Sequence, residues 1–392
     1  MNDWNMTATP GALTDLYKMD ELWTTEQRAI VEEVRRYVDT VVLPAIGQHH
    51  NEERFPEEMI AGLRELGIFE LIADQTVDPI SYGLISRELE RGSSALRSIV
   101  SVQGSLVMGA IQQFGSESQQ ETWLPRLARL DAWGCFALTE PDFGSNPAGM
   151  QSRAEVTPGG YRISGAKCWI TNGVRADVAV VWAKLDDVVH GFLVETDRPG
   201  FTASAIKGKW SFRSSETAQI YLDNVEVARD ALLPGATSLG AALKCLSNAR
   251  YTIAWGVIGA ARACLEETID YLKSRPQFNE QPLASHQLIQ FKLAWMATEI
   301  VGMELIAHRL GQLKTMGKLD PAQLSLAKMN NCRKALEISR TCRELLGANG
   351  IHTEYHVGRR MVDLETVLTY EGTEHIHGLT IGAALTGIKA FG

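Results

Sequence analysis

Apolar residues recur at helical spacing through the first third of the chain. Ile30, Val34 and Tyr37 lie three or four positions apart, and similar spacing continues to about residue 130. Such a period places the apolar side chains on one face of a helix. Thr24 and Gln27 have the spacing of an N-terminal capping box, in which two side chains satisfy free N–H groups of the first turn. We therefore predict a helical region whose first helix follows Thr24.

The pattern changes between about residues 134 and 235. Short runs rich in β-branched and aromatic residues are separated there by Gly, Pro, Asp and Asn, which is typical of strands. These runs are too short and too closely spaced for crossover helices, so we expect an antiparallel β-domain. The candidate strands are residues 135–138, 161–164, 178–183, 191–194, 201–206 and 218–222.

Helical periodicity returns after Pro234 and continues to the end of the chain. We predict helices at residues 237–273, 283–315, 320–346, 356–366 and 374–390. The fold class is therefore α+β, with an N-terminal helical domain, a central antiparallel β-domain and a C-terminal four-helix bundle. The predicted divisions are an N-terminal extension and three domains, at residues 1–22, 23–133, 134–235 and 236–392.

Length and charge narrow the class of protein. A chain of 392 residues exceeds what one hydrophobic core usually serves, so we expect two or three packed regions. Its 38 Lys and Arg against 47 Asp and Glu give a formal charge of −9, and no basic stripe interrupts the sequence. A nucleic-acid partner is therefore not expected.

Cysteine spacing and hydropathy indicate the cellular compartment. The six cysteines form no C-x-x-C pair and no zinc-finger spacing, so reduced thiols are expected. Residues 1–18 lack a basic start followed by an apolar core, and no later stretch approaches the ~20 apolar residues that a membrane span needs. The sequence predicts a soluble, cytoplasmic protein with no leader and no membrane contact.

Residues 369–373 place Glu371 between Tyr370 and Gly372. A carboxylate set between an aromatic side chain and a glycine has room to take a proton from the carbon of another molecule. The alternative is a solvated glutamate at a helix start, since most glutamates are exposed and Gly-Thr is common before helices. Taken alone, the pentapeptide favours this second interpretation.

Two segments of the β-region combine a strand with a polar turn. Residues 136–145 run from a strand into a Pro/Gly turn that exposes backbone donors and hydroxyl groups, although an ordinary loop would have the same composition. Residues 168–173 end a strand at an Asn-Gly turn, where Trp169 is either a core tryptophan or an exposed aromatic face.

These segments, in this order, resemble the acyl-CoA dehydrogenase flavoprotein family. Within it the chain is most similar to the glutaryl-CoA dehydrogenases, from about Leu22 to Phe391. The resemblance implies FAD as cofactor and a homo-oligomer, with a tetramer expected. The chain has no G-x-G-x-x-G after a strand and no Walker loop, which is consistent with a flavin bound outside a Rossmann unit.

The resemblance also implies which residues bind FAD. Those of the β-domain are Phe136, Leu138, Thr139, Gly144, Ser145, Trp169, Ile170 and Thr171. A second set would bind the FAD pyrophosphate of a neighbouring subunit: Arg275, Phe278, Gln287, Leu346 and Gly347. Arginine suits this role because its guanidinium makes forked contacts with phosphate. Thr373 and His375 would lie beside the flavin.

Arg97 follows a helix that carries Glu90, and the simplest interpretation is a surface ion pair of little energetic value. The resemblance implies instead that Arg97 and Ser98 hold a distal carboxylate of the substrate, within a network that includes Glu90 and Tyr370. A buried guanidinium costs several kcal/mol unless an anion pairs with it. This group therefore favours a dicarboxylyl or β-keto-acid-like substrate.

The same resemblance assigns the remaining substrate contacts to Ser145, Arg250, Gly372 and Phe391. A metal site is not predicted. His352 and His356 lie four positions apart, and a second histidine pair begins at His375, but neither pair has further ligands at suitable spacing.

The predicted reaction is FAD-dependent α,β-dehydrogenation of an acyl thioester, with Glu371 as general base and hydride transfer to flavin N5. Decarboxylation of the glutaryl-CoA to crotonyl-CoA type would follow, and electron-transfer flavoprotein would accept the electrons. One alternative is a biosynthetic decarboxylating flavoenzyme of the same fold, such as an epoxyketone synthase or a carrier-protein thioester desaturase, with molecular oxygen as acceptor. Another is a non-catalytic helical scaffold.

Overall fold

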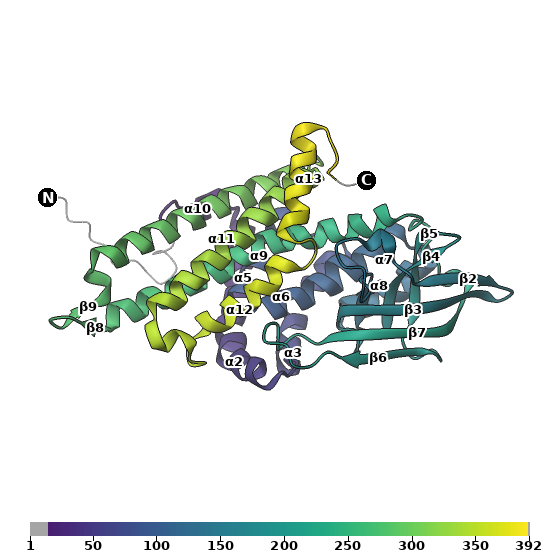
Figure 1. Cartoon of the computed structure of the whole chain (residues 1–392), viewed down its shortest axis with the longest axis horizontal. Coiled ribbons are helices and arrows are strands. Elements are labelled where there is room, and N and C mark those ends of the chain that lie inside the picture. Colours follow the sequence, from purple (N-terminus) through teal and green to yellow (C-terminus); the bar gives the residue numbers. More distant parts are fainter. Residues whose placement is uncertain (1–14, 391–392) are drawn as a thin grey trace.

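The N-terminal helices lie in the middle of the molecule, between the sheet and the α9–α10 turn, in the computed structural model, which describes residues 15–390 (Figure 1). The π-helical turns Val38–Val42 and Ser101–Met108 join some of these helices. Their bounds are α1 Thr25–Tyr37, α2 Leu43–Glu52, α3 Glu57–Glu65, α4 Ile68–Ala73, α5 Pro79–Gly92, α6 Ser94–Val100, α7 Gly109–Phe114 and α8 Glu117–Ala128.

The predicted start of α1 is confirmed. The Thr24 hydroxyl accepts from the Gln27 N–H at 3.2 Å, and the Gln27 side chain accepts from the Thr24 N–H at 3.0 Å. Helix α8 begins with the same reciprocal pair, Ser116 and Gln119. These boxes fix where helices begin because they satisfy backbone donors that have no partner within the helix.

Residues 94–114 correct one expectation from the sequence. Helices α6 and α7 and the π-helical turn between them make one stretch that, by length and composition, could cross a membrane, and all of its apolar window is buried inside the fold. The stretch packs against α9 and the first strand of the sheet. It is a core helix of this fold.

The central region is one seven-stranded sheet that lies at the opposite end of the molecule from the α9–α10 turn (Figure 1). The bounds of its strands are β1 Gly134–Ala137, β2 Arg153–Thr157, β3 Gly160–Thr171, β4 Val178–Leu185, β5 Val188–Glu195, β6 Phe201–Ala205 and β7 Thr217–Ala228. The order is β1-β4-β2-β3-β7-β6, with β5 on β4.

The antiparallel prediction holds for most strand pairs, but β4 pairs in parallel with β1 and with the start of β2. Strand β2 was not predicted. Three of its five residues are exposed, so its sequence lacks the apolar run that reveals the buried strands. The remaining candidate strands are confirmed within a few residues, and β3 and β7 are longer than expected.

The C-terminal helices follow the predicted order. They are α9 Leu239–Ser274, α10 Gln287–Thr315, α11 Pro321–Leu345, α12 His356–Thr369 and α13 Glu374–Thr386. A small hairpin, β8 Pro276–Gln277 with β9 Gln281–Pro282, joins α9 to α10 and was not predicted. Helix α9 is central, because it packs against α5, α10, α11 and α12. Figure 1 shows α13 standing away from the body of the molecule.

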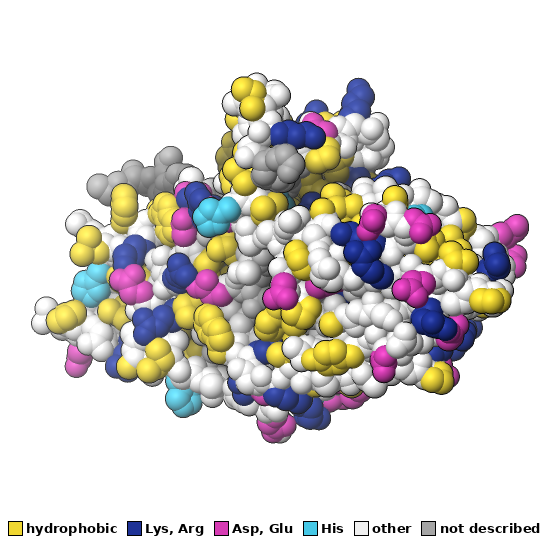
Figure 2. All heavy atoms as spheres, turned by 45° about the vertical axis from the view of Figure 1, so that its right-hand side comes forward, with side chains coloured by type: hydrophobic (Ala, Val, Ile, Leu, Met, Phe, Trp, Pro, Cys, Tyr) yellow, Lys and Arg dark blue, Asp and Glu magenta, His cyan; other side chains and the backbone are white. Residues whose placement is uncertain are grey.

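The surface drawn in Figure 2 has mixed charge. Lys and Arg side chains lie among those of Asp and Glu on this face, with apolar side chains between them. The net charge of −9 is therefore not gathered on this face into a field of one sign.

Candidate active site

A short loop between α12 and α13 carries the candidate base. Glu371 has a φ of 51° and Gly372 a φ of 97°, both in the left-handed region. For a residue with a Cβ this conformation costs roughly 1–2 kcal/mol, so other contacts must hold it. Glycine is required at 372 because a Cβ there would lie 2.9 Å from Nε2 of His377.

Two cations, the buried Lys328 and the partly buried Arg250, bind the backbone carbonyls of this loop. The Lys328 ammonium donates to the carbonyls of Tyr370 and Gly372, each at 2.8 Å. Arg250 Nε donates to the Glu371 carbonyl at 2.7 Å. The loop is thus fastened on both sides of the glutamate. This contact also locates Arg250, a predicted substrate contact, directly beside the base loop.

The Glu371 side chain is partly buried. Its Oε2 atom is buried and has no hydrogen-bond partner among the described residues. Burial raises the pKa of this carboxyl, and the positive charges of Arg97, Lys328 and Arg250 oppose that rise. The interpretation of Glu371 as a solvated glutamate at a helix start is therefore wrong. Raising a carboxyl pKa toward neutrality is how a protein makes it an effective base.

Arg97 lies in the same buried region. Its side chain is 1% exposed, and its Nε donates to Glu90 Oε2 at 2.6 Å. Nη2 donates to the Tyr370 hydroxyl, whereas Nη1 is buried without a partner among the described residues. Burial acts to lower the pKa of Arg97, but Glu90 and Tyr370 raise it above its usual value, so the charge is kept. The interpretation as a surface ion pair is wrong.

Neighbouring residues hold Glu90 in place. Ser94 donates to Glu90 Oε1 at 2.9 Å, and Ser98, on the next turn of α6, is also buried. Gly256 of α9 leaves the space that the carboxylate occupies, because a Cβ at 256 would lie 2.1 Å from Glu90 Oε2. The α5–α9 contact therefore sets the position of the Glu90–Arg97 pair.

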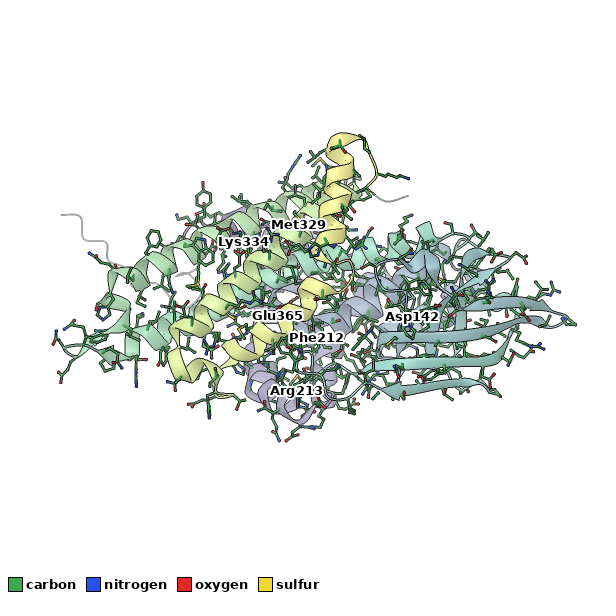
Figure 3. All side chains as sticks on the ribbon, in the orientation of Figure 1. Asp142, Phe212, Arg213, Met329, Lys334 and Glu365 are labelled. Atoms are coloured by element: carbon green, nitrogen blue, oxygen red, sulfur yellow. The ribbon has the colours of Figure 1, made fainter. Side chains whose placement is uncertain are left out.

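The β-domain reaches this region through the loop between β6 and β7. Phe212 and Arg213 belong to this loop (Figure 3). The Phe212 ring meets the Tyr370 ring edge to face with centroids 5.6 Å apart. The Phe212 N–H donates to Asp363 of α12 at 2.6 Å, and Arg213 donates to the His50 carbonyl of α2 at 2.9 Å. One loop thus joins the sheet, the N-terminal helices and the base loop.

The two predicted flavin segments of the sheet lie side by side. The Cys168 N–H donates to the Thr139 carbonyl at 2.9 Å. Trp169 has a φ of 62° and is 60% exposed, at a register shift in the β3–β7 ladder. The interpretation as a core tryptophan is therefore wrong. The other members of the set divide by burial: Phe136, Leu138 and Ile170 are buried, Thr139 and Thr171 are partly buried, and Gly144 and Ser145 are exposed.

The second predicted FAD set is far from Glu371. Arg275, Phe278 and Gln287 are at the α9–α10 turn, at the opposite end of the helices from the sheet (Figure 1). Leu346 is buried and Gly347, with a φ of 59°, is exposed in the turn after α11. The described part of one chain therefore does not bring this set to the sheet.

The remaining predicted residues, Thr373, His375 and Phe391, are at the start of α13 or near the end of the chain. The Thr373 hydroxyl accepts from the Ile376 N–H at 3.3 Å and caps α13, while His375 is exposed. Phe391 lies outside the described residues.

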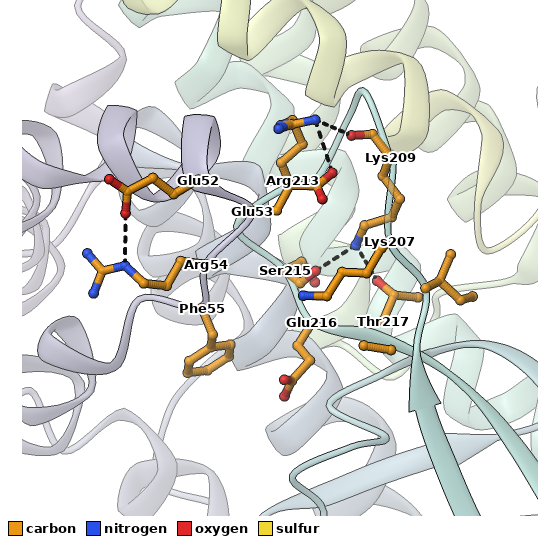
Figure 4. A pocket seen from close by; sticks show the side chains of 12 residues that line it. Glu52, Glu53, Arg54, Phe55, Lys207, Lys209, Arg213, Ser215, Glu216 and Thr217 are labelled. Carbon is orange, nitrogen blue, oxygen red and sulfur yellow. Dashed lines mark hydrogen bonds and ion pairs between the residues drawn. The ribbon is translucent and has the colours of Figure 1, made fainter.

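A surface cavity of about 360 Å³ lies between the α2–α3 turn and the β6–β7 loop, and Glu371 is not among the residues that line it (Figure 4). There the Lys209 ammonium is bound to Ser215 and Thr217, and Arg213 to Glu53.

Sequence reasoning missed Lys328, His377, Tyr82 and Gly256. His377 is 1% exposed, and burial lowers its pKa to about 3, so it is neutral. Burial raises the pKa of Tyr82 to about 12, and its hydroxyl lies 2.9 Å from Ser105 Oγ. For Lys328 the available signal was a lysine at an apolar-face position of the predicted helix 320–346. Lysines are rarely buried without a partner, so such a position indicates a specific contact.

Known proteins share this architecture. Models of the N-terminal, middle and C-terminal domains of acyl-CoA dehydrogenases match residues 24–131, 135–225 and 239–386. A glutaryl-CoA dehydrogenase of Mycobacterium smegmatis, solved in complex with FADH2, is 47% identical with a TM-score of 0.94, over 97% of this chain and 99% of that chain. Glutaryl-CoA dehydrogenase of Desulfococcus multivorans is 31% identical over 95% of this chain and 99% of the relative. Short-chain specific acyl-CoA dehydrogenase of Bos taurus is also 31% identical, over 95% and 93%.

The Glu90–Arg97 contact generates a first prediction. Glu90→Gln would leave the buried guanidinium without its counter-charge, which should cost about 3–5 kcal/mol of unfolding free energy. Urea unfolding followed by circular dichroism measures the loss. Glu354→Gln, at an exposed position, should change stability little. Equal stabilities of the two variants would show that Arg97 does not depend on Glu90.

Proposed function

Because the chain belongs to the acyl-CoA dehydrogenase family and is an FAD-dependent oxidoreductase, we propose that its thioester substrate carries a second carboxylate, as glutaryl-CoA does. The observation that carries this proposal is that Arg97 Nη1 and Glu371 Oε2 are both buried without a partner among the described residues, in two side chains close enough for the Arg97 charge to act on the Glu371 carboxyl. A simple fatty acyl tail would leave that donor unsatisfied, at about 1–3 kcal/mol. A carboxylate would accept from it.

Glu371 takes the α-hydrogen of the thioester. Its buried Oε2 has no partner to compete for the proton, and the raised pKa increases its basicity over that of an ordinary glutamate. Bound FAD supplies the acceptor for the β-hydrogen, as hydride. Arg97 holds the distal carboxylate during this step and so fixes the chain between two anchored ends.

Decarboxylation follows from the same arrangement. After dehydrogenation the distal carboxylate is attached to the γ-carbon, next to the new double bond, so heterolysis of its C–C bond releases CO2 and leaves a carbanion that is delocalised through the double bond into the thioester carbonyl. That carbanion requires one proton, and Glu371 is then the protonated acid beside it. Return of the proton gives the crotonyl thioester and restores the base for another turnover.

Residues of the sheet fit an aromatic cofactor with a polar rim. Trp169 presents an exposed indole, and the hydroxyls of Thr139 and Thr171 lie on the joined segments beside it. A Cβ added at Gly144 would meet nothing within 4 Å, so backbone there is open to a ligand. We assign the isoalloxazine to this surface. Ser145 would bind the cofactor or the thioester tail.

The predicted FAD residues at the α9–α10 turn are far from the sheet of their own chain. A second subunit would bring its copy of these residues to the FAD site. Phe278, Leu288, Phe291 and Ile351 are between 75% and 81% exposed, close in sequence to Arg275, Gln287 and Gly347. An apolar surface of this kind is typical of subunit contacts. It supports a homo-oligomer, and a tetramer is our proposal.

The electron acceptor separates two versions of the function. We propose electron-transfer flavoprotein, as the resemblance implies. In a biosynthetic decarboxylating enzyme of this fold, oxygen would be the acceptor and a β-keto acid or a carrier-bound thioester the substrate. Oxygen consumption with a β-keto acid, compared with electron transfer from glutaryl-CoA to the flavoprotein, distinguishes them.

Trp169→Leu should lower FAD affinity about tenfold, because aromatic stacking contributes roughly 0.5–1.5 kcal/mol. Flavin retained after dialysis, read from its visible absorbance, measures the effect. Trp210→Leu removes another exposed tryptophan, 64% exposed on the β6–β7 loop, and should retain the flavin. Equal flavin loss in both variants would contradict the assignment of the sheet surface.

Glu371→Gln should keep FAD bound and lower the rate of flavin reduction by substrate at least a thousandfold, since the amide cannot take a proton. Anaerobic stopped-flow absorbance measures this rate. In the parent protein the rate should rise with pH through the raised pKa of Glu371, because only the carboxylate is a base. Flavin reduction at the parent rate would rule out Glu371 as the base.

Arg97→Met should reduce kcat/KM for glutaryl-CoA much more than for butyryl-CoA. Loss of a charge-assisted hydrogen bond costs about 1.5–3 kcal/mol, roughly tenfold to a hundredfold. Steady-state assays with both thioesters give the ratio. Release of crotonyl-CoA and CO2 from glutaryl-CoA tests decarboxylation. An unchanged ratio would exclude a carboxylate at Arg97.

A further inference from the structure

We propose that Lys328 is a positioning residue for the general base, because its ammonium fastens the carbonyls on either side of Glu371. The inference rests on the proposed function. Lys328 belongs to α11, is 1% exposed, and donates to the carbonyls of Tyr370 and Gly372 at 2.8 Å each. The ammonium is therefore buried and bonded to this loop.

The backbone of the loop explains why such a clamp is required. Glu371 is held at a φ of 51°, between the last turn of α12 and the cap of α13. A non-glycine residue relaxes from this conformation unless its surroundings oppose the change. Arg250 binds the carbonyl of Glu371 itself, between the two carbonyls that Lys328 binds. Rotation of the peptide units around Glu371 would break these hydrogen bonds. The side chain is thereby directed into the buried region that holds Arg97.

The charge of Lys328 has a second effect. Burial raises the pKa of Glu371, whereas Arg97, Lys328 and Arg250 lower it. The titratable and charged groups around Glu371 are Tyr370 of the same loop and, from the elements packed against it, Tyr82 and Glu90 of α5, Arg97 of α6, Arg250 of α9, Lys328 and Cys332 of α11, and His377 of α13. Removal of one cation leaves burial less opposed, so the pKa of Glu371 should rise further.

Position and charge can be separated by two substitutions. Lys328→Met removes both the donors and the charge, whereas Lys328→Gln removes the charge but keeps an amide donor. Both should shift the pH at which flavin reduction by glutaryl-CoA is half-maximal upward by about one unit, because the base becomes ionised only at higher pH. One unit corresponds to a tenfold lower rate at a fixed pH below that midpoint. The limiting rate at high pH should fall further in Lys328→Met than in Lys328→Gln.

A measurement independent of turnover tests the same inference. Infrared titration of the holoenzyme follows the protonated carboxyl band that is absent in Glu371→Gln, and its midpoint should move upward by the same unit. Lys334→Met is the matched control on α11 (Figure 3). Lys334 pairs with Glu299 and Glu337 at the surface, so neither midpoint should change.

The possible results separate the Lys328 inference from the proposed function. Midpoints of both Lys328 variants that coincide with the parent value would overturn the inference, even if stability falls. Failure of both variants to fold would also overturn it, by making Lys328 a core structural residue. Undiminished flavin reduction in Glu371→Gln would instead contradict the proposed function. An upward shift in both variants, with Glu371→Gln inactive, supports both.

Discussion

The packing of three cations around one partly buried carboxylate, that of Glu371, is the constraint on which the rest of this structure depends. Burial raises the pKa of Glu371, while Arg97, Arg250 and Lys328 limit that rise. An isolated buried carboxylate would simply bind a proton. The surrounding charges, drawn from three different helices, therefore make a partly buried and still ionisable base possible.

That arrangement requires close helix packing. Helix α9 supplies Arg250 to the base loop and Gly256 to the Glu90 carboxylate, and α5 carries Glu90 against it. The buried Glu90 keeps Arg97 charged, and Tyr370 links Arg97 to the loop of the base. Arg97 and the loop of Glu371 are thus parts of one hydrogen-bonded structure.

The sheet contributes a different kind of surface. Trp169 is exposed because a register shift in the β3–β7 ladder turns it outward, with a left-handed backbone. Phe212, on the loop that leaves the sheet, packs on Tyr370. The β6–β7 loop and the loop of Glu371 are therefore joined by direct side-chain contact. The α9–α10 turn, which carries Arg275, Phe278 and Gln287, lies at the far end of the helices from the sheet.

The sequence alone predicted most helices and most strands, because periodicity and turn residues are local properties. The candidate base and the Arg97–Glu90–Tyr370 group were predicted from the family resemblance, since the residues taken alone favoured a solvated glutamate and a surface ion pair. The sequence could not show that β4 pairs in parallel with β1, since β4 follows β1 only after the β2–β3 hairpin. Nor could it reveal Lys328, which lies 43 positions from Glu371 and acts through carbonyls that every residue possesses. Burial and backbone conformation arise only when distant segments pack. Tertiary structure therefore decided which charges surround Glu371 and hence how strong a base it is.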